Sequence, residues 1–359
     1  MEENMPYKKA KKKFMIFMGV SIVIIGLLMV LVFKGERIKE VKEKVGDTKL
    51  AAVVIGDKYG FIDKTGKIVI NPQFDEVSSF SEGLAEVLIG DKYGFIDKTG
   101  KYVVNPQFEH AGSFSEGLAA VSIGDKWGFI DKTGKYVVNP QFDEVSSFSE
   151  GLAAIRIGDK YGFIDKTGKI VVNPQFDYAE SFSEGLATIE IGDKWGFIDK
   201  TGKIVINPQF DDAYHFSVGL AVVLIGDKFG FIDKTGKYVV NPQFEAVSNF
   251  SEGLTAVEIG DKWGFIDKTG KYVVNPQFEH AGSFSEGLAS VEIGGKCGFI
   301  DKTGKIVINP QFEFAFKFSE GLAAIRIGDK WGFIDKTGKI VINPQFESVN
   351  GYFVGGIWR

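Results

Sequence analysis

The chain has 359 residues, a formal net charge of −5 and one cysteine, Cys297. Residues 46–359 hold 32 basic and 42 acidic side chains, and this net charge of −10 argues against nucleic-acid binding, which needs basic patches. One cysteine excludes an internal disulfide, and we expect its thiol to be a small buried hydrophobe.

The amino terminus predicts a membrane anchor. Residues 1–13 form a basic tail with five lysines, and the 20 residues 14–33 carry no charge. At ~1.5 Å per residue this segment matches the thickness of a bilayer core and exceeds the apolar region of a cleavable signal peptide. We interpret it as an uncleaved transmembrane signal anchor, followed by a charged juxtamembrane stalk at 34–49. The clustered lysines favour a single-pass protein of the cell membrane with its remaining chain extracytoplasmic.

A unit of 34 residues then occurs nine times without insertion or deletion across residues 50–355. A fixed period of this size indicates a tandem repeat array, in which neighbouring units share a core. Residues 356–359 fall where a tenth unit would begin. We interpret them as a cap strand on the end of the array.

Each unit is predicted to be an all-β meander. In the first unit, Asp63 can accept a hydrogen bond from the backbone two residues on, and Gly66 suits the positive φ of a tight hairpin. Asn71-Pro72 is expected to bend or end the third strand. The two-helix repeat of the same length is excluded, because each unit carries four fixed glycines and no apolar stripe of period 3.6. The predicted strands of this unit are 50–55, 59–62, 68–70 and a short fourth segment at 74–77.

The repeated residues resemble a known family. The aromatic-glycine pair within Asp-Lys-Trp-Gly-Phe-Ile-Asp, residues 125–131, is similar to that of the WG repeat, also called the KWG repeat. This resemblance implies an all-β repeat that is frequent on exported or membrane-attached bacterial proteins, with no common activity and no catalytic residues to carry over. The eighth unit departs from the pattern at Gly295 and Cys297.

Two arrangements of the nine meanders compete, an open superhelical, solenoid-like array and a closed β-propeller. Propeller blades commonly have four strands and ~40–50 residues, and ~4–8 blades are typical. Nine units of 34 residues fit that description poorly. The sequence therefore favours the open array.

No catalytic, cofactor-binding or metal site is predicted, and we expect the chain not to be an enzyme. Asp57 and Asp63 recur in most units, whereas an active site needs unlike groups in unlike environments. They are interpreted as turn residues. His110, His215 and His280 lie in three different units without metal-ligand spacing.

The positions that vary between units point to a binding face. They follow each Gln-Phe, and variable positions of a repeat array often form one binding surface. The recurring aromatic slot at Tyr59 invites a sugar-stacking hypothesis, but its exchange among Tyr, Trp, Phe and Cys favours packing. The candidate contacts on the variable segments are Tyr178, Tyr214, His215, Phe314 and Phe316.

These features favour a membrane-anchored, surface-exposed, non-enzymatic binding or scaffold protein. Its expected partners are the membrane, through residues 14–33, and a cell-wall glycan or another surface protein. Two alternatives remain. A carbohydrate-active enzyme would need two carboxylates outside the repeated slots, and a mechanical spacer would give the variable segments no role.

Overall fold

A computed structural model describes residues 49–349. The predicted basic tail, the anchor at 14–33 and the cap strand at 356–359 lie outside the described residues, as does almost all of the stalk. Within the part that the structure describes, no helix is long and apolar enough to cross a membrane.

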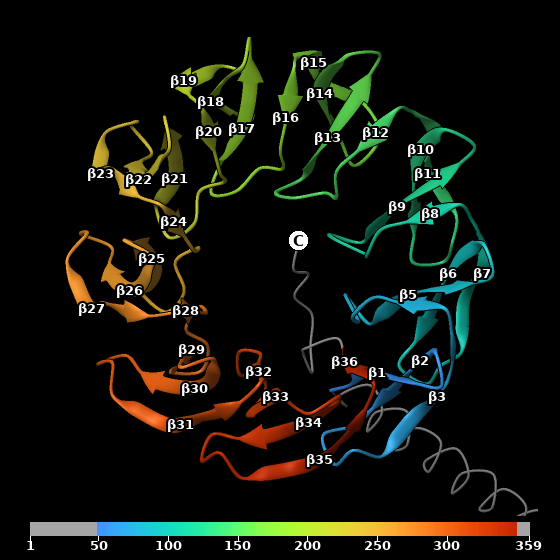
Figure 1. Cartoon of the computed structure of the whole chain (residues 1–359). Helices are drawn as coiled ribbons and strands as arrows, with labels where there is room; N and C mark the ends of the chain where they lie inside the picture. Colours follow the sequence, from blue (N-terminus) through green and yellow to red (C-terminus); the bar gives the residue numbers. More distant parts are fainter. Residues whose placement is uncertain (1–48, 350–359) are drawn as a thin grey trace, which may run out of the picture. The chain divides into compact units, whose positions relative to one another are not determined.

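Residues 49–349 form nine four-stranded antiparallel sheets arranged as blades around a ring (Figure 1). Each blade begins with a two-residue strand, followed by a second and a third strand of five or six residues and an outer strand of seven. In Figure 1 the two-residue strands β20, β24, β28 and β32 face the centre of the ring, whereas β19, β23, β27 and β31 face outward. Blade 1 is β36-β1-β2-β3, blade 2 is β4 to β7, and the numbering continues to blade 9, β32 to β35.

The four strand types recur at fixed positions of the repeat. The two-residue strands are β4 (Glu76–Val77), β8 (His110–Ala111), β12 (Glu144–Val145), β16 (Tyr178–Ala179), β20 (Asp212–Ala213), β24 (Ala246–Val247), β28 (His280–Ala281), β32 (Phe314–Ala315) and β36 (Ser348–Val349). The second strands are β1 (Ala51–Ile55), β5 (Leu84–Ile89), β9 (Leu118–Ile123), β13 (Leu152–Ile157), β17 (Leu186–Ile191), β21 (Leu220–Ile225), β25 (Leu254–Ile259), β29 (Leu288–Ile293) and β33 (Leu322–Ile327). The third strands are β2 (Lys58–Ile62), β6 (Lys92–Asp97), β10 (Lys126–Asp131), β14 (Lys160–Asp165), β18 (Lys194–Asp199), β22 (Lys228–Asp233), β26 (Lys262–Asp267), β30 (Lys296–Asp301) and β34 (Lys330–Asp335). The outer strands are β3 (Ile68–Phe74), β7 (Tyr102–Phe108), β11 (Tyr136–Phe142), β15 (Ile170–Phe176), β19 (Ile204–Phe210), β23 (Tyr238–Phe244), β27 (Tyr272–Phe278), β31 (Ile306–Phe312) and β35 (Ile340–Phe346).

Every 34-residue unit contributes its last strand to the next blade. The first unit ends with β4, which pairs with β5 of the second unit rather than with β1. The ninth unit ends with β36, which pairs with β1 through Val349 opposite Val53 and Ser348 opposite Val54. The last strand therefore completes the first blade and closes the ring.

The prediction of nine all-β meander units with a short fourth strand is confirmed, but the preference for an open array was wrong. The β-propeller alternative is the fold that forms. A unit of 34 residues suffices for a four-stranded blade because the fourth strand lies across the junction, so a short repeat does not argue against closure. The third predicted strand also bends rather than ends at Asn71-Pro72, since β3 continues to Phe74.

The hairpin between the third and outer strands forms as predicted. The carboxylate of Asp63 accepts hydrogen bonds from the backbone N–H of Thr65 at 2.9 Å and of Lys67 at 3.1 Å, and Gly66 has φ of 83°. The pairing of β2 with β3 shifts register on both sides of Phe61. The shift between Phe61 and Tyr59 falls where the outer strand bulges at Asn71-Pro72.

The bulge explains the glycine of the aromatic-glycine pair. A Cβ added at Gly128 would lie 2.6 Å from the backbone nitrogen of Pro140, which is closer than real Cβ atoms approach. The same backbone contact occurs at this glycine in all nine blades. Only glycine lets the outer strand cross so close to the third strand.

Neighbouring blades share one hydrophobic core at each seam, the contact surface between them. The phenylalanine of the third strand packs on a phenylalanine in the loop before the next blade's second strand, as in Phe129 and Phe148 at 4.7 Å between ring centroids. Alternate residues of each second strand serve the two seams, so Ala120 faces blade 4 while Ala119 and Val121 face blade 2. Among the described residues the closing seam has a similar strand core, with Val53 and Val349 packed against Phe333.

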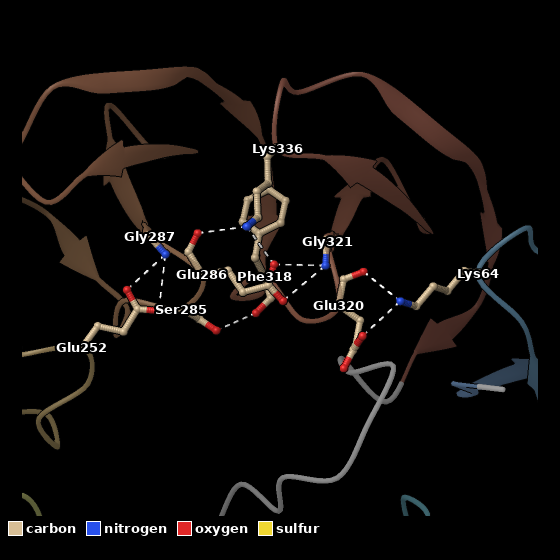
Figure 2. Close-up of polar contacts among 9 residues, drawn as sticks. All are labelled: Lys64, Glu252, Ser285, Glu286, Gly287, Phe318, Glu320, Gly321 and Lys336. Carbon is tan, nitrogen blue, oxygen red and sulfur yellow. Dashed lines mark hydrogen bonds and ion pairs between the residues drawn. The ribbon is translucent and has the colours of Figure 1, made fainter. Parts of the chain in front are cut away.

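Polar latches cross the seams on the hairpin rim, the side of the ring that carries the Asp63 hairpin and its copies. Figure 2 shows three successive latches. The carboxylate of Glu286 accepts a hydrogen bond from the N–H of Gly321 at 3.0 Å and pairs with Lys336 at 2.9 Å, both on the next blade. Burial alone would raise the pKa of Glu286, but the Lys336 and Gly321 hydrogen bonds bring that pKa below its ordinary value.

The lysine contact of this latch also spans the junction between the two ends of the ring. Glu320 of blade 9 pairs with Lys64 of blade 1 at 3.1 Å (Figure 2). The closing junction therefore shares this ion pair with the other seams. On the opposite side, the turn rim, Lys58 pairs with Asp75 and the second Asp75 oxygen accepts from the N–H of Gly90 at 2.8 Å.

One latch is interrupted by sequence. Val218 stands where the other described loops have Glu, and its φ of 52° lies in the left-handed region, which disfavours a β-branched residue. Its seam, between blades 6 and 7, has no carboxylate opposite Gly253 and Lys268. Within residues 49–349 this seam also lacks the serine-to-carbonyl bond that Ser183 makes with Phe216 one seam earlier.

We expect Gly128→Ala to destabilise the protein by about 3 kcal/mol, because the new methyl group must displace backbone on the neighbouring strand. The measurement is the urea unfolding midpoint. Gly112→Ala in the same blade is the matched control, since its Cβ would meet only the Ala120 methyl at 3.9 Å. Equal losses in the two variants would contradict the packing explanation.

We expect Val218→Glu to stabilise the ring by about 1–2 kcal/mol, because it removes a β-branched residue from positive φ and supplies a partner for Gly253 and Lys268. The reciprocal Glu116→Val should lose a similar amount by breaking the bonds to Gly151 and Lys166. Thermal unfolding of both variants checks the pair. A neutral Val218→Glu beside a destabilised Glu116→Val would show that the blade 6–7 seam is built differently.

Candidate functional site

Each blade carries a row of side chains on one face, near the turn rim. In blade 3, register places His110 opposite Ser122, Ser122 opposite Trp127 and Trp127 opposite Phe142. Residues paired across antiparallel strands project from the same face of the sheet. The fourth member is Phe in every blade, whereas the first three differ between blades. We call these three positions the variable row.

The nine variable rows combine different chemistries around the ring. From blade 1 to blade 9 they are Ser348, Val54, Tyr59; Glu76, Leu88, Tyr93; His110, Ser122, Trp127; Glu144, Arg156, Tyr161; Tyr178, Glu190, Trp195; Asp212, Leu224, Phe229; Ala246, Glu258, Trp263; His280, Glu292, Cys297; and Phe314, Arg326, Trp331. This variation contrasts with the constant hairpins and third-strand cores.

The row of blade 4 is a polar cluster. Tyr161 donates its hydroxyl hydrogen to Glu144 at 2.6 Å, and Glu144 pairs with Arg156 at 3.2 Å. Burial and the Glu144 hydrogen bond together raise the pKa of Tyr161, so the phenol stays protonated as a donor. The cluster therefore offers a fixed combination of carboxylate, guanidinium and phenol.

The aromatic slot packs as the sequence indicated, but its rings are not sealed inside the core. Tyr178 lies between Tyr161 of blade 4 at 4.9 Å and Trp195 of its own blade at 5.6 Å, measured between ring centroids. Tyr161 is buried, whereas Tyr178 and Trp195 are half-buried. The slot rings thus support the walls of shallow grooves along the seams.

The five predicted contact residues lie on two-residue strands or directly after them, in three places on the ring. Tyr178 and His215 line the same depression of about 420 Å³. Phe314 and Phe316 contact Trp331 at 5.7 and 5.2 Å between centroids. Tyr214 is 40% exposed and lies 6.4 Å from Phe229, so the structure does not bring all five into one site.

Sequence reasoning missed the middle position of the variable row, on the second strand. The signal was present, because the residue before each strand-ending isoleucine changes between Leu, Ser, Arg and Glu at 88, 122, 156 and 190. Its membership of the row depends on cross-strand register, which one unit read by itself does not specify.

One carboxylate beside the rows is unusual. Glu86 is half-buried on β5, where other blades have Ala, Thr, Val or Ser, and its backbone N–H donates to Ser78 at 2.9 Å. Burial raises the pKa of Glu86 to about 7, and the nearby Glu76 carboxylate contributes to the rise. Between residues 49 and 349, no three His, Cys, Asp or Glu side chains gather as a metal site would require.

The closed ring of four-stranded meanders defines a nine-bladed β-propeller. The chain belongs to the WG-repeat family. The family model described as WG containing repeat matches residues 59–93, 93–127, 127–161, 161–195, 195–229, 229–263, 263–297, 298–331 and 331–357. No curated protein matches the sequence.

Solved structures resemble the chain in fold. A crystal structure described as the eukaryotic initiation factor has a TM-score of 0.64 at 10% identity, covering 84% of this chain and 97% of that one. Dihydro-heme d1 dehydrogenase NirN in complex with DHE has a TM-score of 0.45 at 14% identity, covering 73% and 74%. AztD of Citrobacter koseri has 0.41 at 14%, covering 84% and 96%. At these identities the first match shows fold alone, and no functional conclusion is drawn from any of them.

We expect Glu86 to make stability fall with rising pH. Its folded pKa of about 7 exceeds the ordinary 4.5, so the folded chain binds more protons between these values. The penalty is absent below about pH 4.5 and complete above about pH 7. Glu86→Gln should therefore gain on the order of 3 kcal/mol at pH 8 relative to its difference from the parent chain at pH 4.

Urea unfolding at the two pH values measures this difference, and Glu86→Ala, which copies the residue of blade 3, should behave alike. A gain that is the same at both pH values would instead indicate a packing effect.

Proposed function

We propose that this WG-repeat propeller is a non-enzymatic binding or scaffold module whose partner contacts the variable rows and the segments after the two-residue strands. The observation that carries the proposal is the separation of constant from variable positions within each unit. The constant residues form the turns, latches and seam cores, whereas variation is concentrated in the variable rows and in the segments after the two-residue strands. Variation at such positions changes recognition without changing the ring.

The chemistry of the rows suits a cell-wall glycan or a protein partner. Half-buried aromatic rings offer flat apolar faces, and Glu144, Arg156 and Tyr161 offer charged and polar groups beside them. Sugars and protein side chains are both bound by such combinations of ring faces and hydrogen-bonding groups. The acidic balance of the repeats disfavours nucleic acid.

The proposal places the propeller at the cell membrane, with residues 14–33 as the single anchor and the repeats outside the cytoplasm. Its support is the length and the flanks of the apolar segment. Protease added to intact cells should remove the repeats, while protease protection until the membrane is broken would reverse the orientation.

The binding test uses the full chain in mild detergent, because residues 14–33 are apolar. It combines co-sedimentation with purified cell-wall sacculi and a pull-down from membrane extract. We expect pelleting or recovery of one specific protein that survives moderate salt, since an acidic propeller should not bind acidic polymer by charge.

We expect the combined Tyr178→Ser, Tyr214→Ser and Phe316→Ser variant to weaken this binding at least ~10-fold, at roughly 1 kcal/mol per lost ring contact. A matched control replaces three residues of the outer strands with exposed side chains, Tyr238, Val205 and Val307, by Ser. Equal binding by both variants would contradict the assignment of the binding face. Binding to neither sacculi nor protein would favour the mechanical spacer.

A further inference from the structure

Two segments of the ring provide an internal comparison. Residues 101–119 and 271–289 are identical, so blades 3 and 8 begin with the same two-residue strand and the same loop. His110 in blade 3 is therefore copied as His280 in blade 8. The aromatic slots two strands across from these histidines differ, with Trp127 in blade 3 and Cys297 in blade 8.

In blade 3 the imidazole has an aromatic partner. The rings of His110 and Trp127 stack with centroids 6.0 Å apart and planes 18° from parallel. In blade 8 the same position holds the small Cys297 side chain, and a cavity of about 440 Å³ opens beside it. The histidine beside the indole of blade 3 and the loop that follows it are thus kept in blade 8, where the indole is absent.

The far wall of this cavity, contributed by blade 9, is aromatic at two positions. Phe314 and Phe316 line it, and Phe316 stacks on Trp331 with centroids 5.2 Å apart and planes 25° from parallel. The corresponding residues of blade 4 are Glu144 and Ser146. Phe314 is 44% exposed, so part of its ring is open to a ligand.

A carboxylate lies beside the missing ring. Glu292 is directly across the strand pair from Cys297 and lines the cavity, where blade 3 has Ser122. The other cavity carboxylate, Glu313, already lies near Lys296 and Arg326 at 4.0 and 3.8 Å. Lys317 lines the cavity as well, and burial lowers its pKa. Within residues 49–349 Glu292 makes no ion pair, so it is the cavity carboxylate open to an N–H or ammonium group.

We propose that this cavity binds a planar aromatic ring of indole size that carries a hydrogen-bond donor or a positive charge, on a free small molecule or on a partner's side chain. The ring stacks on His280 where Trp127 stacks on His110, packs against Phe314, and donates to Glu292. The proposal deepens the proposed function, because it assigns a ligand chemistry to one part of the same variable surface.

The thiol reports occupancy directly, because Cys297 is the only cysteine. Burial, together with the nearby Glu292 carboxylate, raises the pKa of Cys297, so labelling is followed at mildly alkaline pH on the full chain. Saturating tryptamine should slow labelling at least ~10-fold and indole less, whereas indole-3-acetate should protect least because it repels Glu292. A tryptophan-containing peptide that protects better than tryptamine would assign the ring to a partner's side chain.

Cys297→Trp is the decisive variant, since it restores the residue of blades 3, 5, 7 and 9. It should abolish tryptamine binding in calorimetry while thermal stability rises, which separates loss of the site from loss of folding. Cys297→Ala should retain binding. Glu292→Gln should weaken tryptamine at least ~10-fold and leave indole nearly unchanged.

Two results would overturn the proposal. These are tryptamine and peptide that neither protect the thiol nor release heat, and equal tryptamine binding by Cys297→Trp.

The partner assay separates this proposal from the broader function. If Cys297→Trp still pellets with sacculi or recovers its protein partner, the binding function does not depend on this ligand. If the chain binds tryptamine but neither sacculi nor a protein, the ligand proposal stands and the proposed binding function is wrong.

Discussion

The ring depends on one exchange at each junction, in which the last strand of a unit pairs with the first strand of the next unit. Because a unit's last two residues of β structure pair with the following unit, no unit is complete without its neighbour, and the ninth unit is complete only when β36 reaches β1. The backbone pairing is short, but the Phe-Phe contact, the shared core and the Glu-Lys latch reinforce it at the same seam. Closure therefore adds a seam of the usual kind and removes both unpaired ends.

The constant part of the repeat is dictated by this arrangement. Gly128 and its copies let the outer strand bulge against the third strand, and the bulge sets where the chain turns inward to form the next two-residue strand. Asp63 and its copies fix the hairpins from which the latch lysines project. With so many positions committed to geometry, the positions that remain free to differ are those of the variable rows and their neighbouring loops. The candidate site thus follows from the same constraint as the fold.

The strands, the Asp-based hairpin and the variable inner segment could be predicted, because each depends on residues close together in the chain. Closure could not, since it rests on Val349 meeting Val53 across nearly the whole repeat array, and ring size depends on small angles between blades that no local pattern encodes. For the candidate site, Phe314 and Phe316 were chosen from their variability, whereas Glu292 and Cys297 were not joined to them. Their association needs both the cross-strand register of blade 8 and the identity of the neighbouring blade.

The near-identity of the seams has a consequence for how the chain reaches this state. A unit that docks onto the wrong neighbour, or onto a unit of a second molecule, makes the same hydrogen bonds and buries the same phenylalanines. Local energy therefore discriminates little between correct and skipped partners, and repeat proteins are prone to such misassembly. Chain connectivity and the angular fit of the final junction must distinguish the correct neighbour from a skipped one. A ring with the wrong number of blades is therefore disfavoured only at the last step, when the final strand pairs with the first blade.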